Sequence, residues 1–159
     1  MKKVAFHTLG CKVNQVETEQ LKEEFNNRGY SIVDFNEEAD IYIINTCTVT
    51  HVSDRKSRAV IRRAARKNPN ALIVATGCLA QVDAEQLATI KGVNLVVGNR
   101  DKDKIIDIID DYNSKNTTGK TKIIADAIDK HTKLVPVMYS QKHRRTRAFV
   151  KIQDGCERN

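Results

Sequence analysis

The stretch HTLGCKVN, from His7 to Asn14, decides the fold. An apolar run, Val4 to Phe6, leads into it, and the stretch then supplies a glycine, a cysteine and a polar turn. Short apolar runs that are rich in β-branched residues and end at turn signals are typical of buried strands. Because a helical pattern follows Cys11, the stretch predicts a strand, a cysteine-bearing loop and a helix.

The same pattern occurs twice more along the chain. The apolar run Ile41–Ile44 is followed, after two residues, by Cys47. The run Leu72–Ala75 is followed in the same way by Cys78. Strands that alternate with helices form a mainly parallel sheet through right-handed crossovers, and ligands bind at the edge where the carboxyl ends of the strands lie. We therefore expect Cys11 and the two later cysteines to converge at that edge.

These patterns predict a doubly wound α/β domain over residues 1–112, with a mainly parallel five-stranded sheet flanked by four helices. Strands are expected near residues 3–8, 30–35, 40–45, 71–75 and 94–97. Helices are expected from about 14 to a stop at 29, then from about 53 or 54 to 67, and over 83–90 and 101–112. Asn14 and Glu17 resemble a capping box at the start of the first helix, and Asp83 resembles the N-cap of the third.

The remaining residues predict a linker and the start of another domain. Residues 113–140 have a linker composition at their start, and within them 122–125 and 134–139 could form short strands. Residues 141–159 contain a basic loop, an alternating strand pattern over 146–153 and then Cys156. A strand with no partner after it indicates a second domain that this chain lacks.

The composition is that of a globular protein, with 159 residues of which 40% are hydrophobic and 30% charged. No apolar run reaches the length of a membrane span, and the N-terminus enters a strand without a signal-peptide pattern. A cytoplasmic location is therefore expected. In that compartment four cysteines are more typical of metal ligands or catalytic groups than of disulfides.

The net charge of +7 is unevenly placed along the chain. Residues 1–112 hold 16 Lys and Arg against 16 Asp and Glu, while residues 113–159 hold 11 against 4. This asymmetry indicates an anionic partner, most simply nucleic acid.

Two groups of basic residues are candidates for contact with RNA. At 100° per residue, one stripe of the second helix carries Arg55, Arg58, Arg62 and Arg66. Val60, Ile61 and Ala64 lie on the other side and are expected to face the sheet. A solvated helix face explains the stripe equally well. The second group is the basic loop, with Lys142, Arg144, Arg145 and Arg147.

Three cysteines at three strand ends suit a metal site with one open position. An iron–sulfur cluster with one unique iron fits this pattern, and so does a zinc ion with a bound water. Soft thiolate ligands alone do not separate the two. His51 is a weaker candidate for a fourth ligand, whereas His7 is expected to be a packed core residue. A cysteine taken alone is usually a small buried apolar residue, but three cysteines at three strand ends are harder to explain in that way.

Three separated strings carry a resemblance to a known family. They are Leu9-Gly10-Cys11 with Asn14 and Glu19, Asn45-Thr46-Cys47 with the basic helix after it, and Gly77-Cys78-Leu79-Ala80-Gln81. Together they resemble the N-terminal domain of the radical S-adenosylmethionine methylthiotransferases. The strings over residues 7–19 and 44–63 most resemble the branch that acts on threonylcarbamoyladenosine in tRNA.

The resemblance implies the cofactors and their ligands. By the match, Cys11, Cys47 and Cys78 would hold an auxiliary [4Fe–4S] cluster. Cys156 would be the first ligand of a second [4Fe–4S] cluster, which binds S-adenosylmethionine in a radical barrel. The second cysteine of that motif would fall one residue beyond Asn159. The chain is therefore expected to be an N-terminal fragment that holds at most one cluster and is inactive alone.

The implied reaction of the parent protein is the insertion of a methylthio group at carbon 2 of N6-threonylcarbamoyladenosine, beside the anticodon of tRNA. The isopentenyladenosine and ribosomal-protein branches of the family are alternatives. Two other classes also remain open, namely a non-catalytic RNA-binding α/β module and a nucleotide-binding α/β protein. The absence of a G-x-G-x-x-G loop or a P-loop after the first strand counts against the last.

Overall fold

The computed structural model describes residues 1–115 and 121–126, and every structural statement below concerns these residues. The first half contains β1 (Lys3–Thr8), α1 (Lys12–Asn27), β2 (Ser31–Val33), β3 (Ile41–Thr46) and α2 (His51–Lys67). The second half contains β4 (Leu72–Gly77), α3 (Cys78–Val82), α4 (Ala84–Ala88), β5 (Leu95–Val97), the 3-10 helix η1 (Asn99–Lys104), α5 (Ile105–Ser114) and β6 (Lys122–Ile124).

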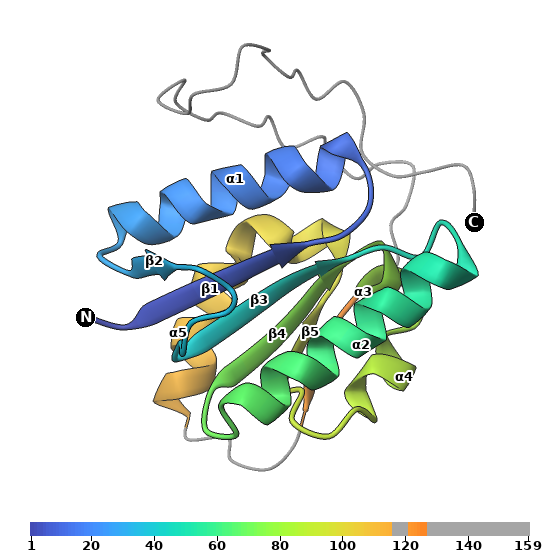
Figure 1. Cartoon of the computed structure of the whole chain (residues 1–159). Helices are drawn as coiled ribbons and strands as arrows, with labels where there is room; N and C mark the ends of the chain where they lie inside the picture. Colours follow the sequence, from blue (N-terminus) through green and yellow to red (C-terminus); the bar gives the residue numbers. More distant parts are fainter. Residues whose placement is uncertain (116–120, 127–159) are drawn as a thin grey trace.

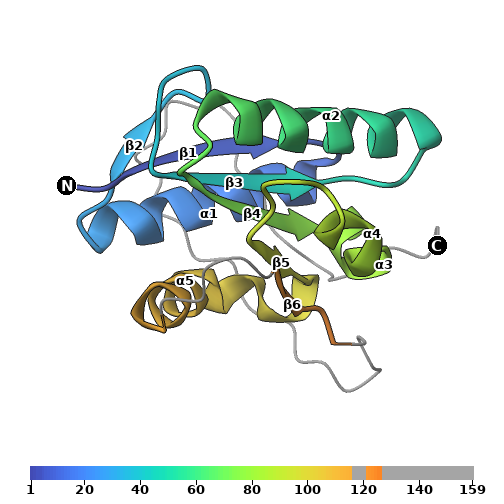
Figure 2. The ribbon, with the colours of Figure 1, turned by 90° about the horizontal axis from the view of Figure 1, so that it is seen from below.

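The strands form one six-stranded sheet in the order β2-β1-β3-β4-β5-β6, and every neighbouring pair is parallel. Helices cover both faces of this sheet: α1 and α5 lie on one face, and α2, α3 and α4 lie on the other (Figures 1 and 2). The α/β class and the doubly wound, parallel architecture predicted from the sequence are therefore confirmed.

Alternation along the strands divides the core into two apolar layers. In β3, Tyr42 and Ile44 pack under α2 with Ile61, whereas Ile41 and Ile43 pack under α1 with Phe25. Every residue of β3 and β4 is buried, as expected for central strands of a sheet that is covered on both faces.

The strand order places a topological switch point between β1 and β3. These neighbouring strands are followed by helices on opposite faces, α1 after β1 and α2 after β3 (Figure 2). In doubly wound folds a crevice opens at such a point, outside the carboxyl ends of the strands. The fold thus provides a natural binding position at the end of β1 and β3.

The sheet has six strands rather than the five that were predicted. The additional strand, β6, pairs with β5 through Leu95 and Lys122, and it lies where the sequence indicated that residues 122–125 could form a short strand within the linker region. It is only three residues long, so its alternation is too short to separate it from a loop by pattern alone.

Several predicted helix boundaries were wrong. The second helix begins at His51, because the Thr50 side chain accepts a hydrogen bond from the Ser53 N–H and acts as N-cap. The predicted helix over 83–90 is two short helices, α3 and α4, separated at Asp83. The last predicted helix is a 3-10 segment, η1, followed by α5.

The predicted cap of the first helix was also wrong. The helix α1 begins two residues before Asn14, and Cys11 occupies the N-cap position without a capping side-chain bond. Asn14 is only 3% exposed and is used elsewhere. No helix among the described residues is long and apolar enough to cross a membrane.

Candidate functional site

Three cysteines lie at the carboxyl ends of three adjacent strands. Cys11 follows β1 and is exposed, Cys47 directly follows β3 and is buried, and Cys78 directly follows β4 and is partly buried. Because β1 pairs with β3 and β3 with β4, the structure brings all three to the same edge of the sheet. This edge includes the switch point between β1 and β3.

Gly10 allows the loop of Cys11 to lie directly on Cys47. Its φ of +96° lies in the region that side chains rarely adopt, and a Cβ atom there would come within 2.7 Å of the Cys47 Cβ and 2.8 Å of its Sγ. Gly77 plays the same part before Cys78. Its φ is +94°, and a Cβ atom there would collide with the Asn45 Oδ1 and the Thr46 carbonyl oxygen.

The buried side chain of Asn14 ties the first two cysteine loops together. Its Nδ2 donates to the carbonyl oxygen of Leu9 at 2.8 Å and to that of Thr46 at 3.1 Å. Asn45 completes the network, because its Nδ2 donates to the Asn14 carbonyl oxygen at 3.0 Å. The Asn45 side chain thus fixes the end of β3 to the start of α1.

Two hydroxyl groups fix the backbone around Cys47 and Cys78. The Thr46 Oγ1 donates to the Thr76 carbonyl oxygen at 2.5 Å and accepts from the Ala80 N–H at 3.3 Å. Ser57, which is fully buried on α2, accepts from the Cys47 N–H at 3.1 Å and donates to the Cys47 carbonyl oxygen at 2.9 Å. The three loops are therefore held by the protein itself.

The electrostatic environment of Cys78 combines opposing effects. Burial raises the pKa of the Cys78 thiol, and the ammonium group of Lys102 acts in the opposite direction. The thiols of Cys47 and Cys11 also influence it, which places the three groups within electrostatic reach of one another. Helix α1 begins directly after Cys11, and a helix N-terminus favours negative charge such as that of thiolates.

The donor set at this edge of the sheet is three thiol groups, one from each of three loops. Residues 1–115 and 121–126 contain no group of three His, Cys, Asp or Glu side chains close enough to hold one ion. In a four-iron cluster each thiolate binds a different iron, so its ligands are farther apart than those of a single zinc. Three loops that each present one cysteine suit that arrangement.

The basic stripe of α2 is not uniform. Arg58 is engaged by two carboxylates, because its Nε lies 2.5 Å from the Asp54 Oδ1 and its Nη2 lies 2.7 Å from the Asp83 Oδ2. The other members of the stripe, Arg55, Arg62 and Arg66, are exposed. On the inner side, Ile61 and Ala64 are buried and Val60 is partly buried, which confirms the predicted orientation of the helix.

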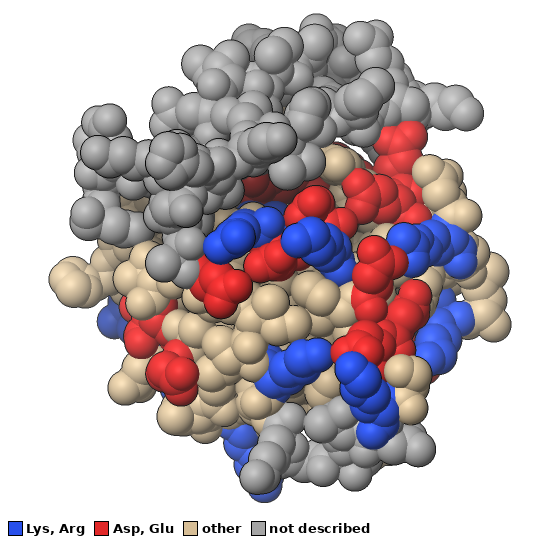
Figure 3. Space-filling view, turned by 180° about the vertical axis from the view of Figure 1, so that it is seen from behind, with Lys and Arg blue, Asp and Glu red and all other residues tan. Residues whose placement is uncertain are grey.

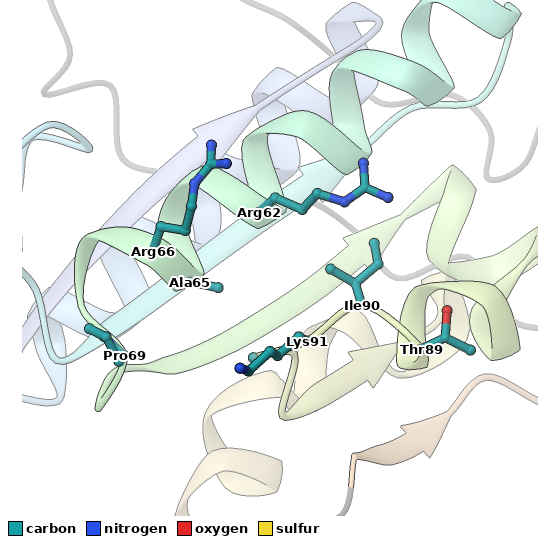
Figure 4. Close-up of a pocket in the computed structure, with 8 residues that line it drawn as sticks. Arg62, Ala65, Arg66, Pro69, Thr89, Ile90 and Lys91 are labelled. Atoms are coloured by element: carbon teal, nitrogen blue, oxygen red, sulfur yellow. The ribbon is translucent and has the colours of Figure 1, made fainter.

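Two of these arginines line a groove of about 690 Å³ between α2 and the loop before β5 (Figure 4). Arg62 and Arg66 project from α2, and Lys91 lies on the loop across the groove. Ala65 and Ile90 contribute apolar lining. No acidic residue contributes to this lining in the described part of the chain.

The opposite face of the molecule has a different charge pattern. Acidic and basic side chains are interleaved over α1 and α5 (Figure 3). Arg28 lies 2.7 Å from an Asp107 oxygen, and Lys115 lies 2.6 Å from an Asp111 oxygen, so these cations are paired. The α2 groove is thus the more suitable of the two faces for an anion.

The other predicted site residues lie outside the described residues. These are Cys156 and the basic loop residues Lys142, Arg144, Arg145 and Arg147. His51 is exposed at the start of α2, and His7 is partly buried against Phe35 with ring centroids 4.8 Å apart.

Comparison with known proteins places the chain in a family. Residues 3–98 match the model of the family described as uncharacterized protein family UPF0004. The chain belongs to this family. The matched residues of this UPF0004 chain include the three cysteines at the sheet edge and the loops that carry them.

Curated relatives of this UPF0004 chain carry more specific names. It is 46% identical to threonylcarbamoyladenosine tRNA methylthiotransferase MtaB of Bacillus subtilis, over 98% of the chain and 34% of that protein. It is 43% identical to the MtaB of Aquifex aeolicus, over 98% of the chain and 37% of that protein. A tRNA-2-methylthio-N(6)-dimethylallyladenosine synthase of Methylacidiphilum infernorum is 32% identical, over 98% and 34%. The chain thus spans about a third of the length of these relatives.

Sequence reasoning missed several residues that build the site of this UPF0004 chain. Ser57 shares a face with Ile61 and Ala64, and this spacing was a signal that its hydroxyl is buried. Lys102 gave no such signal, because it lies in the charged run 100–104 and yet is only 6% exposed. Lys91 was missed because only the fold brings it opposite α2.

Proposed function

We propose that the chain is the N-terminal part of a tRNA methylthiotransferase, and that Cys11, Cys47 and Cys78 hold an auxiliary [4Fe–4S] cluster. The observation that carries this proposal is the placement of the three cysteines at the ends of adjacent strands, beside the switch point. The names of the relatives supply the reaction class. Identities of 46% and 43% to the MtaB proteins, against 32% to the dimethylallyladenosine enzyme, favour threonylcarbamoyladenosine as the modified base.

In the full-length protein, the auxiliary cluster would supply sulfur for a methylthio group at carbon 2 of the modified adenosine. The residues of this chain would provide three thiolates, so that one iron would keep an open position. Asn14, Thr46 and Ser57 would hold the three loops in place. Cys156 would be the first ligand of a second cluster, which binds S-adenosylmethionine outside the described residues.

The proposed partner is tRNA, and the α2 groove is the better-supported surface for it among the described residues. Arg62, Arg66 and Lys91 line it without an acidic neighbour, and phosphate contacts with such cations dominate RNA affinity. Arg58 is assigned a structural part instead, because it joins α2 to Asp83 between α3 and α4. The basic loop over 142–147 is a second proposed contact.

Nucleoside analysis tests the proposed reaction. The full-length enzyme would be produced in cells that lack their own methylthiotransferase, and their tRNA would be digested and examined by mass spectrometry. We expect a methylthio group on threonylcarbamoyladenosine, and its loss in the Cys11→Ala, Cys47→Ala and Cys78→Ala variants. A methylthio group on isopentenyladenosine would reassign the substrate, whereas full activity of these variants would contradict the cluster site.

Anaerobic reconstitution tests the cluster separately from the reaction. After incubation with iron and sulfide, the chain Met1–Asn159 should bind about four iron and four sulfide ions, as a [4Fe–4S] cluster requires. Each of the three cysteine variants should bind much less. Binding of tRNA without any uptake of iron would instead favour a non-catalytic RNA-binding module.

A further inference from the structure

A buried ion pair joins α1, which begins directly after Cys11, to η1. The Nζ of Lys102, on η1, is 2.5 Å from the Oε2 of Glu17, on α1. The two side chains are only 7% and 12% exposed, which makes this the most buried ion pair of the described residues. Lysine and glutamate are rarely buried, because their charged groups lose hydration, so the position of this pair calls for a physical reason.

The two residues of the pair lie on α1 and η1, and both elements are close in the fold to loops that carry cysteines. Glu17 is on the second turn of α1, which starts directly after Cys11. Lys102 is on η1, and η1 packs against β4 and α3, at whose junction Cys78 lies.

The layer around the carboxyl ends of β3, β4 and β5 is shielded from bulk water. Three buried polar atoms near the carboxyl ends of β3, β4 and β5 have no hydrogen-bond partner among the described residues: Asn45 Oδ1, Thr76 Oγ1 and Asn99 Oδ1. This layer is thus buried away from bulk water, where charges interact more strongly than at a solvated surface.

Reduction of an iron–sulfur cluster adds a negative charge to it. A nearby cation stabilises the reduced form more than the oxidised form and raises the reduction potential, and a nearby anion lowers it. Local charge and solvent exposure are among the main determinants of cluster potentials.

We propose that Lys102 and Glu17 set the reduction potential of the cluster at Cys11, Cys47 and Cys78, with Lys102 raising it and Glu17 lowering it. This inference rests on the proposed function, because it requires a cluster at the cysteine edge. Neither residue is a ligand. Each acts on the potential through its charge, and each partly cancels the effect of the opposite charge on the other residue.

The test is a redox titration of the reconstituted chain Met1–Asn159, followed by electron paramagnetic resonance. Lys102→Met should shift the potential to lower values, because it removes the cation and leaves the Glu17 carboxylate. Glu17→Gln should shift it to higher values, because it leaves the Lys102 ammonium without its anion. Lys102→Arg keeps the positive charge, so its reduction potential should stay close to that of the unsubstituted chain.

A second ion pair on the same element provides the matched control. Lys104 is bonded to Asp101 at 2.9 Å, and its side chain is 60% exposed. Lys104→Met removes a cation from a solvated position on the same element, so it should leave the potential close to that of the unsubstituted chain.

Opposite shifts in the two single variants separate a charge effect from structural damage, which would lower iron content in both. Shifts of the same sign, or no shift in either, would overturn the inference while leaving the proposed cluster intact. If Lys102→Met does not fold, Glu17→Gln decides alone, and an unchanged or lower potential would overturn the inference. Failure of the unsubstituted chain to take up iron would overturn the proposed cluster and this inference together.

Discussion

At the scale of single residues, Asn14 has the clearest structural role. Its amide joins the carbonyl oxygens that precede Cys11 and Cys47, so it holds two loops with one side chain. Replacing it by alanine leaves both buried acceptors without this donor. Loss of such a buried partner typically costs about 1–3 kcal/mol.

We therefore expect Asn14→Ala to lower the free energy of unfolding of the apo-chain by about 1–3 kcal/mol in urea titrations. Asn27→Ala is the matched control, because Asn27 is exposed at the end of the same helix. Exposed substitutions of this kind usually change stability by less than about 0.5 kcal/mol. Equal effects of the two variants would show that Asn14 does not hold the loops.

Because Cys78 is partly buried, the pH dependence of its reaction with an alkylating reagent should be shifted. Burial raises the pKa of its thiol above the ordinary value of 9.0, so less thiolate is present at pH 8 than in an unfolded chain. The folded apo-chain then binds more protons than the unfolded chain, and this contribution to stability is lost as the pH rises through the raised pKa of the folded state.

Alkylation of the apo-chain by iodoacetamide, followed peptide by peptide in a mass spectrometer, measures this directly. The rate at Cys78 should have its midpoint above pH 9.0 in the folded chain and return to the ordinary range in urea. A midpoint below that of the unfolded chain would mean that the Lys102 ammonium outweighs burial.

Individual residues also show which parts of the site could be predicted from the sequence. The positions of Cys11, Cys47 and Cys78 were predictable, because short apolar runs place strand ends reliably in a buried parallel sheet. The role of Asn14 was not, since an asparagine near a helix start is equally typical of a cap. Its real partners lie on another strand and are set by the sheet register, in which Thr8 lies beside Asn45.

At the scale of elements, α2 combines two functions on one helix. Ser57, Ile61 and Ala64 attach it to the sheet and to Cys47, while Arg62 and Arg66 line the groove toward Lys91. The predicted stripe of four arginines was periodic enough to identify the helix face. It did not separate Arg58 from the rest, because the carboxylate of Asp83 comes from beyond β4.

Replacement of Arg62, Arg66 and Lys91 by glutamine should weaken tRNA binding by the full-length protein. The log–log salt dependence should become flatter by about 0.7–0.9 for each phosphate that these cations no longer neutralise. The matched control replaces Lys22, Arg28 and Lys115 by glutamine, because these cations are paired with acids on the α1 and α5 face. Titrations at several salt concentrations would measure both.

The basic loop is the competing surface and needs its own variant. Neutralising Lys142, Arg144, Arg145 and Arg147 together removes four of the cations that give residues 113–159 their excess charge. If this variant alone weakens binding, the loop and not the groove contacts tRNA. Unchanged binding in both variants would place the RNA contacts outside this chain.

At the scale of the whole molecule, apolar packing on both faces of the sheet holds the fold together. Two apolar layers enclose the sheet, and the cysteine loops are fixed by protein hydrogen bonds. We therefore expect the apo-chain to keep its far-ultraviolet circular dichroism spectrum and a cooperative thermal transition. Chelation that abolishes either would contradict this, because only metal-dependent domains unfold when the metal is removed.

The same chain should hold a single cluster. Cys156→Ala should leave its iron content unchanged, whereas Cys47→Ala should lose most of the iron, since Cys47 is the buried cysteine beside Gly10. Elemental analysis after anaerobic reconstitution gives both values. Loss of most iron in Cys156→Ala would overturn the assignment of the three cysteines.

Hydrogen bonds made by Asn14, Thr46 and Ser57 fix the cysteine loops, so iron would be bound by loops that are already folded. A protein that folds only around its metal is degraded when the metal is scarce. If its cysteines hold a cluster, as proposed, this chain would keep its fold through a period of iron starvation. The existing apo-protein could then take up iron as soon as iron returned, and no new protein would have to be synthesised.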